Sequence, residues 1–265
     1  MIQEVGKILW NDCLGPTYYR MGIGLSGVFV HSIPGQFVMV RLPGRLTPFL
    51  RRPFSIHRIT PGTDGGVVVE LLYKVVGAGT AQFSELTGGD TVDVLGPLGN
   101  GFTVADEARQ VFLVAGGIGV APLLFLAASL RKRGFQPERL SLFLGGRSSQ
   151  DLLCRQDFEK LGIVAHLTTD DGTEGDQCLI THPVEVEAER RRPDLICACG
   201  PMAMLKCVAG IAEKYSVPCQ ISTETLMACG MGACLGCAME NRLNPDKYLH
   251  ACLDGPVFEA GSLLI

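Results

Sequence analysis

The chain has 265 residues with 47% hydrophobic and 19% charged content, which describes a folded protein of two or three domains. Its formal net charge of −4 gives no reason to expect nucleic acid or an anionic membrane as a partner. The opening MIQEVGKILW has no apolar signal-peptide core, so we expect a cytoplasmic protein whose eleven cysteines are ligands or free thiols rather than disulfides.

The first hundred residues predict an antiparallel β domain. Runs rich in Val, Ile, Phe and Thr, such as GQFVMVRLPG, RRPFSIHRIT and GGVVVELLYKVVG, are separated by Gly and Pro turns. Strands at this spacing are typical of a barrel or a sandwich. A short helix is expected in GAGTAQFSEL with Thr80 as its N-cap, and the turn residues of VDVLGPLGNGF are expected to close the domain.

Two stretches of this β domain carry residues suited to a flavin nucleotide. The candidates are Arg52, Pro53, Phe54 and Ser55 in RRPFSI, followed by Lys74, Gly79 and Thr80 in YKVVGAGT. The guanidinium of Arg52 offers a fork of donors for a pyrophosphate, and Pro53 with Phe54 offers an apolar wall. Lys74 adds a second cation, and Gly79–Thr80 lies at a helix start that suits phosphate. Taken alone, the same residues also fit ordinary strand arginines and turn glycines.

From about residue 103, strands and helices alternate. They are expected in QVFLVAG, APLLFLAASLRKRG, LSLFLGG, DLLCRQDFEKLG, IVAHLTTD, DLICACG and PMAMLKCVAGIAEKY. This alternation predicts a doubly wound parallel sheet. The uncharged run 111–130 is as long as a membrane-spanning helix, but glycines and Pro122 interrupt it, so we expect a buried strand, a glycine turn and a helix.

Two loops of this α/β region are candidates for binding a nicotinamide nucleotide. In VAGGIGVAPL, the glycines Gly116, Gly117 and Gly119 would let a pyrophosphate lie against a helix N-terminus, although a turn for close packing is the alternative. In CACGP, Cys199 follows a buried strand and could face the nicotinamide, while Gly200–Pro201 shapes the turn. Two further segments also follow expected strands: LGGRSS (144–149) and the aspartates at 170–171. They suit contacts to a ribose or adenine, and ordinary solvated loops are the alternative.

The last fifty residues are loop-like and rich in cysteine. Cys229, Cys234, Cys237 and Cys252 have the spacing C-x4-C-x2-C-x14-C, which is that of plant-type [2Fe–2S] proteins. Two irons need four thiolates from different directions, and a tight wrap favours glycines with φ > 0; Gly230, Gly232 and Gly236 are placed for this. Zinc, which favours two C-x2-C units or added histidines, and disulfides are the alternatives.

These motifs occur in an order that resembles the ferredoxin-reductase-type family of FAD/NAD(P) oxidoreductases: RRPFS, then GAGT, GGIGVAP and CGP. The added MACGMGACLGCAM and CLDGPVF look specifically like the electron-transfer subunits of class 1B dihydroorotate dehydrogenases. The resemblance covers nearly the whole chain. It implies three cofactors, FAD, a [2Fe–2S] cluster and NAD, although Arg147 and Ser148 could in principle hold a 2′-phosphate. It also implies FAD contacts at Arg52, Pro53, Phe54, Ser55, Tyr73, Lys74, Val75, Gly79 and Thr80.

The expected architecture has three parts: an FAD-binding β barrel at 1–102, an NAD-binding α/β domain at 103–216, and a loop-rich cluster domain at 217–265. The resemblance implies electron transfer from the FMN of a dihydroorotate dehydrogenase catalytic subunit, through the cluster and FAD, to NAD⁺ in pyrimidine biosynthesis. A heterotetramer of two plus two subunits is expected. No pair of catalytic side chains is evident, so the chain alone should be a diaphorase.

Two other functions stay open at this point. The first is an NAD(P)H oxidoreductase of the same layout that serves a ferredoxin- or sulfide-linked partner. The second is a metal-stabilised binding module without redox activity, whose C-terminal cysteines hold zinc. A visible spectrum separates the second from the others, because flavin and iron–sulfur absorb and zinc does not.

Overall fold

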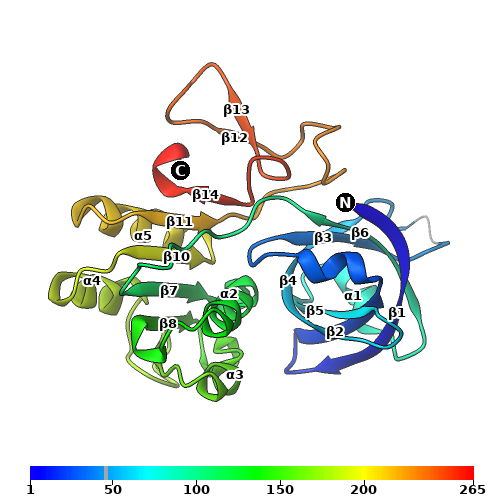
Figure 1. The fold of residues 1–265 in the computed structure, drawn as a ribbon, viewed down its shortest axis with the longest axis horizontal. Helices are drawn as coiled ribbons and strands as arrows, with labels where there is room; N and C mark the ends of the chain where they lie inside the picture. The colour runs from blue at the N-terminus through cyan, green and yellow to red at the C-terminus, as the bar shows by residue number, and fades with distance from the viewer. Residues whose placement is uncertain (45–46) are drawn as a thin grey trace.

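The computed structural model describes residues 1–44 and 47–265. A β barrel and an α/β lobe lie side by side, and the C-terminal segment runs over the junction between them (Figure 1). None of the helices in these described ranges combines the length and apolar composition that a membrane crossing requires. The uncharged run 111–130 forms a strand, a glycine turn and a helix, as predicted.

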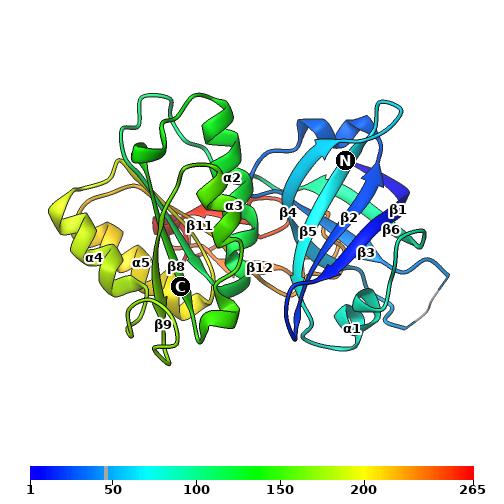
Figure 2. The same ribbon diagram turned by 90° about the horizontal axis from the view of Figure 1, so that it is seen from below.

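The N-terminal lobe is a closed six-stranded barrel in the order β1-β2-β5-β4-β3-β6. Its elements are β1 (Ile2–Cys13), β2 (Tyr18–Leu25), β3 (Phe37–Arg41), β4 (Arg52–Pro61), β5 (Val67–Lys74), α1 (Ala78–Ser84) and β6 (Thr91–Leu98). All neighbouring pairs are antiparallel, and β1 closes the barrel by pairing with both β2 and β6. Figure 2 shows the barrel beside the α/β lobe.

Two local predictions for the barrel are wrong. The segment expected to be a closing turn is strand β6, because Val92 and Val94 alternate into the barrel core. The N-cap of α1 is Gly77 rather than Thr80, which lies one turn further on. The hydroxyl of Thr80 still serves the helix start, because it accepts hydrogen bonds from the main-chain N–H groups of Val76 (2.9 Å) and Gly77 (3.2 Å).

The second lobe is a six-stranded sheet in the order β14-β11-β10-β7-β8-β9, with β14 antiparallel to the rest. Its strands are β7 (Val111–Gly116), β8 (Leu140–Gly146), β9 (Ala165–Thr169), β10 (Leu195–Cys199), β11 (Cys219–Ser222) and β14 (Val257–Glu259). Its helices are α2 (Val120–Lys132), α3 (Arg155–Lys160), α4 (Thr181–Arg190) and α5 (Met202–Lys214). Helix α4 was not anticipated. The predicted parallel, doubly wound sheet is confirmed.

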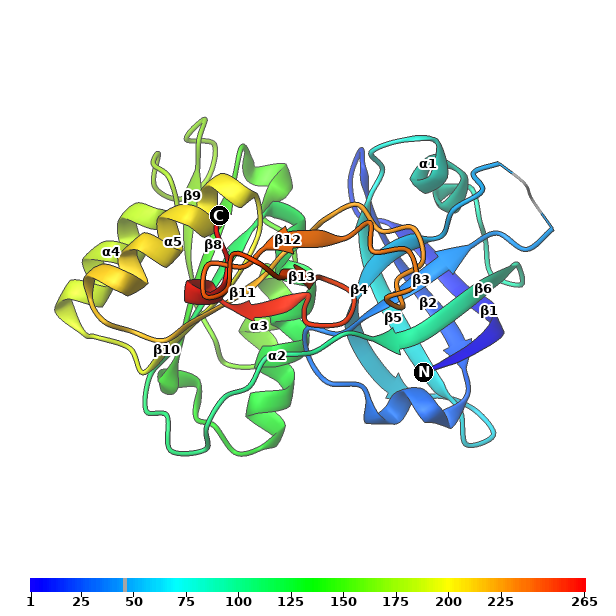
Figure 3. The same ribbon diagram turned by 90° about the horizontal axis from the view of Figure 1, so that it is seen from above.

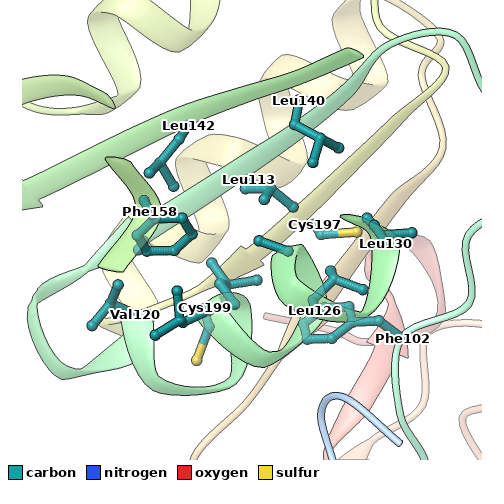
Figure 4. Close-up of a cluster of buried hydrophobic side chains, with 14 of the residues drawn as sticks. Phe102, Leu113, Val120, Leu126, Leu130, Leu140, Leu142, Phe158, Cys197 and Cys199 are labelled. Carbon is teal, nitrogen blue, oxygen red and sulfur yellow. The ribbon is translucent and has the colours of Figure 1, made fainter. Parts of the chain in front are cut away.

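Strand β7 shows why the sequence reads as an unbroken apolar run. Val111, Leu113 and Ala115 pack on the face covered by α2 and α3, whose core is drawn in Figure 4. Phe112 and Val114 pack on the opposite face with residues of α4 and α5. A parallel strand covered on both faces has no polar side to alternate with.

The C-terminal segment belongs to both lobes (Figure 3). It contributes β11 and β14 to the sheet, so the sheet continues past residue 216, where the division into nucleotide and cluster domains was predicted. Between them, β12 (Ala238–Glu240) and β13 (Tyr248–His250) form a small hairpin. The loop before β12 packs on the barrel, because a Cβ at Gly230 would lie 2.4 Å from Cγ of Met39 in β3. The domain boundaries themselves stay a prediction.

Candidate functional site

The four cysteines of the C-terminal segment lie in two pairs. Cys237 and Cys252 are buried, with their sulfur atoms 3.2 Å apart, inside a core cluster that also contains Met39 of the barrel. Cys229 and Cys234 form the outer pair, in which Cys229 is half-buried and Cys234 is exposed. One pair is thus embedded where the two lobes meet, and the other faces the surface.

Main-chain N–H groups already point at these sulfur atoms. Cys229 Sγ accepts from the N–H groups of Met231 and Cys234, both at 3.4 Å, and Cys252 Sγ accepts from that of Gly232 at 3.1 Å. Burial opposes ionisation of Cys229, but these donors outweigh it and lower its pKa to about 7. A loop that offers N–H donors to sulfur is prepared to hold thiolates.

The glycine prediction for this loop is right at two positions and wrong at one. Gly230 (φ 72°) and Gly232 (φ 82°) adopt the left-handed backbone that a tight wrap was expected to need. Gly236 does not, and the adjacent Leu235 (φ 58°) takes that conformation instead. The sequence predicts where the loop turns, but it does not predict which residue adopts the left-handed conformation.

The paired arrangement fits a two-iron cluster better than the alternatives. All eleven cysteines are free, which excludes the disulfide framework. Within residues 1–44 and 47–265, no three ligating side chains converge on one point as a mononuclear zinc site requires. Two thiol pairs with N–H donors suit two irons, each taking two thiolates.

The predicted flavin residues lie along one partly covered strip of the barrel. Arg52, Pro53, Phe54 and Ser55 are consecutive in β4, and all four are only half-buried. The guanidinium of Arg52 lies over the start of α1, so close that a Cβ on Gly79 would be 2.9 Å from its Nε. The structure therefore brings together Arg52 and the Gly79–Thr80 turn, which are distant in sequence. A half-buried strip beside a cation fits a flavin nucleotide.

Tyr73, Lys74 and Val75 follow at the end of β5, but their side chains have different surroundings. The Tyr73 ring is buried in the barrel, stacked on Tyr19, and its hydroxyl donates to Asn11 Oδ1 at 3.0 Å. Only its main chain is therefore available to a flavin. Lys74 instead donates to the Tyr18 hydroxyl at 2.8 Å and lines a cavity on the nucleotide side.

The two predicted nicotinamide loops touch each other. A Cβ on Gly119 would lie 2.2 Å from the carbonyl oxygen of Cys199, and one on Gly116 would lie 2.8 Å from Cδ of Pro201. Gly119 therefore permits close approach of two backbones and Gly116 permits close packing of the Pro201 ring, as the packing alternative proposed. The contact also places the two loops at one carboxyl edge of the sheet, where nucleotides bind in open α/β folds.

A cavity of about 880 Å³ opens beside these loops, between the two lobes. Gly116, Gly117, Gly200 and Pro201 line it from the sheet, and Tyr18 and Lys74 line it from the barrel. Arg147 and Asp170, from the loops after β8 and β9, line it as well. The ribose and adenine candidates thus lie in the same cavity as the glycine loops. Sequence reasoning missed Tyr18, because nothing in its strand marks it as a cavity residue.

The Cys199 thiol does not line this cavity. It lies within the core cluster on the α2 side of the sheet (Figure 4), where burial and the nearby Glu224 raise its pKa to about 12. Its contact with nicotinamide therefore stays a prediction. Glu224, which was not anticipated, lines the cavity, and burial raises its pKa.

Two family models match the chain. The iron–sulfur cluster binding domain of dihydroorotate dehydrogenase B matches residues 224–264, and the oxidoreductase NAD-binding domain matches residues 113–210. Among curated proteins, the dihydroorotate dehydrogenase B (NAD(+)) electron transfer subunit of Caldanaerobacter subterraneus subsp. tengcongensis is 38% identical, covering 97% of each chain. The same subunit of Listeria welshimeri is 39% identical, covering 98% of each.

Solved structures share the fold. The NADH-dependent reduced ferredoxin-NADP oxidoreductase, described for flavin-based electron bifurcation, superposes with a TM-score of 0.83 at 28% identity, covering 98% of this chain and 90% of that one. A ferredoxin NADP⁺ reductase of Neisseria gonorrhoeae with bound FAD and NADP has a TM-score of 0.66 at 16% identity, covering 80% and 91%. The latter likeness concerns the fold alone.

Proposed function

Because the chain belongs to the family of dihydroorotate dehydrogenase B electron transfer subunits, we propose that it carries electrons from a catalytic dihydroorotate dehydrogenase subunit to NAD⁺ in pyrimidine biosynthesis. It is an oxidoreductase subunit whose cofactors are FAD, a [2Fe–2S] cluster and NAD. The ferredoxin-linked alternative is less well supported, since its structural relative is 28% identical and the curated subunits reach 39%. The paired cysteines at the junction of the lobes carry the proposal.

Each part of the site has a task in this function. When bound, the cluster moves single electrons, and FAD couples them to the two-electron reduction of nicotinamide. The side chains of Cys229, Cys234, Cys237 and Cys252 hold the cluster. Arg52 neutralises the flavin pyrophosphate, and the half-buried strip of β4 covers part of the flavin. The glycine loops and the cavity hold NAD⁺. The chemistry on dihydroorotate belongs to the catalytic subunit.

The outer side of the cluster loop is the proposed contact with the FMN-containing catalytic subunit. Met231 and Leu235 are 41% and 58% exposed, beside the exposed Cys234. Met227 and Met239, the other apolar residues considered for this surface, pack partly against the chain's own core. Exposed apolar side chains around a redox centre suit a partner that must approach it closely. A heterotetramer of two plus two subunits is the proposed assembly.

Replacing a cluster ligand tests the proposal. Cys234→Ser removes one of four thiolates, so we expect loss of the cluster's visible absorption and of most bound iron and acid-labile sulfide. Electron transfer from the partner should fall at least about a hundredfold, since the N–H donors around the cluster support its ligands but cannot replace one. NADH oxidation by ferricyanide should persist, because it needs only the flavin.

Cys13→Ser is the matched control, since Cys13 is also exposed but lies on the barrel. It should keep iron, sulfide and electron transfer. A Cys234→Ser protein with full iron content, or anaerobically purified wild-type protein without iron, would contradict the proposal. Dihydroorotate oxidation by the isolated chain would contradict the need for a partner.

A further inference from the structure

Four polar side chains from the two lobes meet at the wall of the nucleotide cavity. Tyr18 and Lys74 come from the barrel, and Arg147 and Asp151 come from the loop after β8. The Tyr18 hydroxyl donates a hydrogen bond to Asp151 Oδ1, and Lys74 Nζ lies 3.7 Å from the same oxygen. The carboxylate of Asp151 therefore joins the predicted flavin strand to the predicted ribose loop.

The other oxygen of Asp151 holds Arg147. Asp151 Oδ2 accepts a hydrogen bond from the main-chain N–H of Arg147 at 3.1 Å and lies 3.5 Å from its side-chain Nε. Asp151 is only 8% exposed, whereas the Arg147 side chain is largely exposed, so water screens their charge interaction and the main-chain bond is the firmer contact. Burial opposes its ionisation, but the bonds from Tyr18 and Arg147 outweigh burial and lower its pKa. It stays a carboxylate, with Lys74 near one of its oxygens and Arg147 near the other.

Arg147 lies where the 2′ position of the adenine ribose is expected, which is the position at which NAD and NADP differ. It follows β8, the strand next to β7 with its glycine turn. In open α/β sheets the adenine ribose lies over such a strand end, where an arginine receives the 2′-phosphate of NADP and a carboxylate receives the 2′-hydroxyl of NAD. Asp170 brings a second carboxylate there, since its main-chain N–H donates to the Gly146 carbonyl at 3.0 Å and it also lines the cavity.

We infer that Asp151 determines selectivity for NAD over NADP, because it fixes the main chain at Arg147 and places a buried negative charge beside the guanidinium that a 2′-phosphate would need. Asp151 is thus a positioning residue that acts through Arg147, and the barrel anchors it through Tyr18. This inference rests on the proposed function and deepens it. It explains why an arginine and serines after β8, which suit NADP by sequence, belong to a chain whose relatives use NAD.

The test is the isosteric substitution Asp151→Asn in the full-length protein with its cofactors. Binding of adenosine 2′,5′-bisphosphate and of 5′-AMP is measured by titration calorimetry, which needs no electron transfer. The ratio of kcat/KM for NADPH and NADH is measured with ferricyanide. Removing a buried negative charge that would repel the 2′-phosphate should raise both the relative affinity for the bisphosphate and the NADPH/NADH ratio by about tenfold or more.

Two further variants make the result specific. Tyr18→Phe removes the hydroxyl bond but leaves the carboxylate on Arg147, so the selectivity ratio should stay within about twofold of wild type. Adding Arg147→Gln to Asp151→Asn should cancel the gain. Flavin and iron contents of each variant show whether it is folded.

Several outcomes would overturn the inference. One is an unchanged ratio in folded Asp151→Asn protein, and another is an equal rise in Tyr18→Phe, which would indicate general loosening of the lobes. If Asp151→Asn does not fold, Arg147→Gln alone decides: a large loss of bisphosphate affinity would show that Arg147 already binds the phosphate. Failure of the proposed function would look different, since wild-type protein would then take no electrons from a dihydroorotate dehydrogenase catalytic subunit, whatever its nucleotide preference.

Discussion

Arg51 and Arg52 are neighbours in sequence with different tasks in the structure. The guanidinium of Arg51 is committed to Asp93, with Nη2 2.9 Å from Oδ2 and Nη1 donating to the Asp93 carbonyl at 3.0 Å. That of Arg52 extends over Gly79 and, among the residues that the structure describes, donates to the nearby carbonyls of Leu50 and Arg51. The sequence predicts Arg52 as the flavin contact, and the fold supplies the physical reason: within residues 1–44 and 47–265, Arg51 is committed to an ion pair and Arg52 is not.

Arg52→Ala should therefore yield protein depleted in FAD. Loss of a charge-assisted contact to a pyrophosphate weakens binding by about 1.5–3 kcal/mol, or roughly ten- to a hundredfold. Flavin occupancy is measured from the absorbance of FAD released on denaturation. Arg51→Ala is the matched control and should lower thermal stability while keeping FAD. Equal occupancy in both variants would mean that Arg52 does not grip the flavin.

At the scale of elements, the position of the cluster loop depends on its contact with strand β3 of the barrel. Gly230 lies against Met39, which is fully buried in β3, and Gly232 lies against Leu253, where a Cβ would be 2.4 Å from Cδ1. Both glycines also have positive φ. A side chain at Gly230 would both strain the backbone and push the loop away from β3.

Gly230→Ala should accordingly reduce cluster incorporation, with iron per chain falling to less than about half and stability falling by about 1–3 kcal/mol. Gly236→Ala is the matched control, because its nearest neighbour would be Cys234 Sγ at an ordinary 3.6 Å and its φ is not positive. It should incorporate iron normally. If both variants assemble the cluster equally well, the loop does not rely on this contact.

For the whole molecule, the contact between the lobes includes a fully buried histidine. His57 of β4 lies with Nδ1 3.1 Å from the Ala121 carbonyl of α2, and its Nε2 is 4.0 Å from Cys154 Sγ. Burial lowers the pKa of His57 to about 4, assisted by the nearby Arg58 and Arg20 and opposed by the Ala121 bond and Asp157. The lobes pack around a neutral imidazole.

This histidine predicts a loss of stability in mild acid. In the unfolded chain His57 takes up a proton near pH 6.5, but in the folded protein it resists protonation until about pH 4. His57 therefore leaves the free energy of unfolding nearly unchanged well above pH 6.5 and lowers it as the pH falls toward 4. From this group alone, the free energy of unfolding should be about 2 kcal/mol lower at pH 5 than at pH 7. Urea unfolding at the two pH values measures this difference.

His57→Gln should make that difference smaller, while His31→Gln, at an exposed position of the barrel lobe, should not. Comparing variants removes the contribution of the carboxylates, which titrate in all of them. An identical loss between pH 7 and pH 5 in wild type and His57→Gln would show that protonation of His57 does not oppose folding.

The sequence by itself determined what depends on neighbours along the chain. The C-x4-C-x2-C-x14-C spacing, the apolar run of β7 broken by glycines, and the β-rich first hundred residues predicted the cluster motif and both lobes. These features can be predicted from the sequence because ligand spacing and hydrophobic periodicity depend on residues that are close along the chain. Errors at Thr80, Gly236 and β6 arose where several local conformations satisfy the same residues.

Only the tertiary structure decided what depends on residues brought together from distant segments. Tyr18 and Lys74 meet Asp151 across the two lobes, Gly119 touches the Cys199 carbonyl, and Gly230 rests on Met39. A contact between segments a hundred residues apart depends on how the elements pack, and no spacing along one segment encodes it. The shape of the nucleotide cavity and the partner of each charge in it are therefore set by the fold.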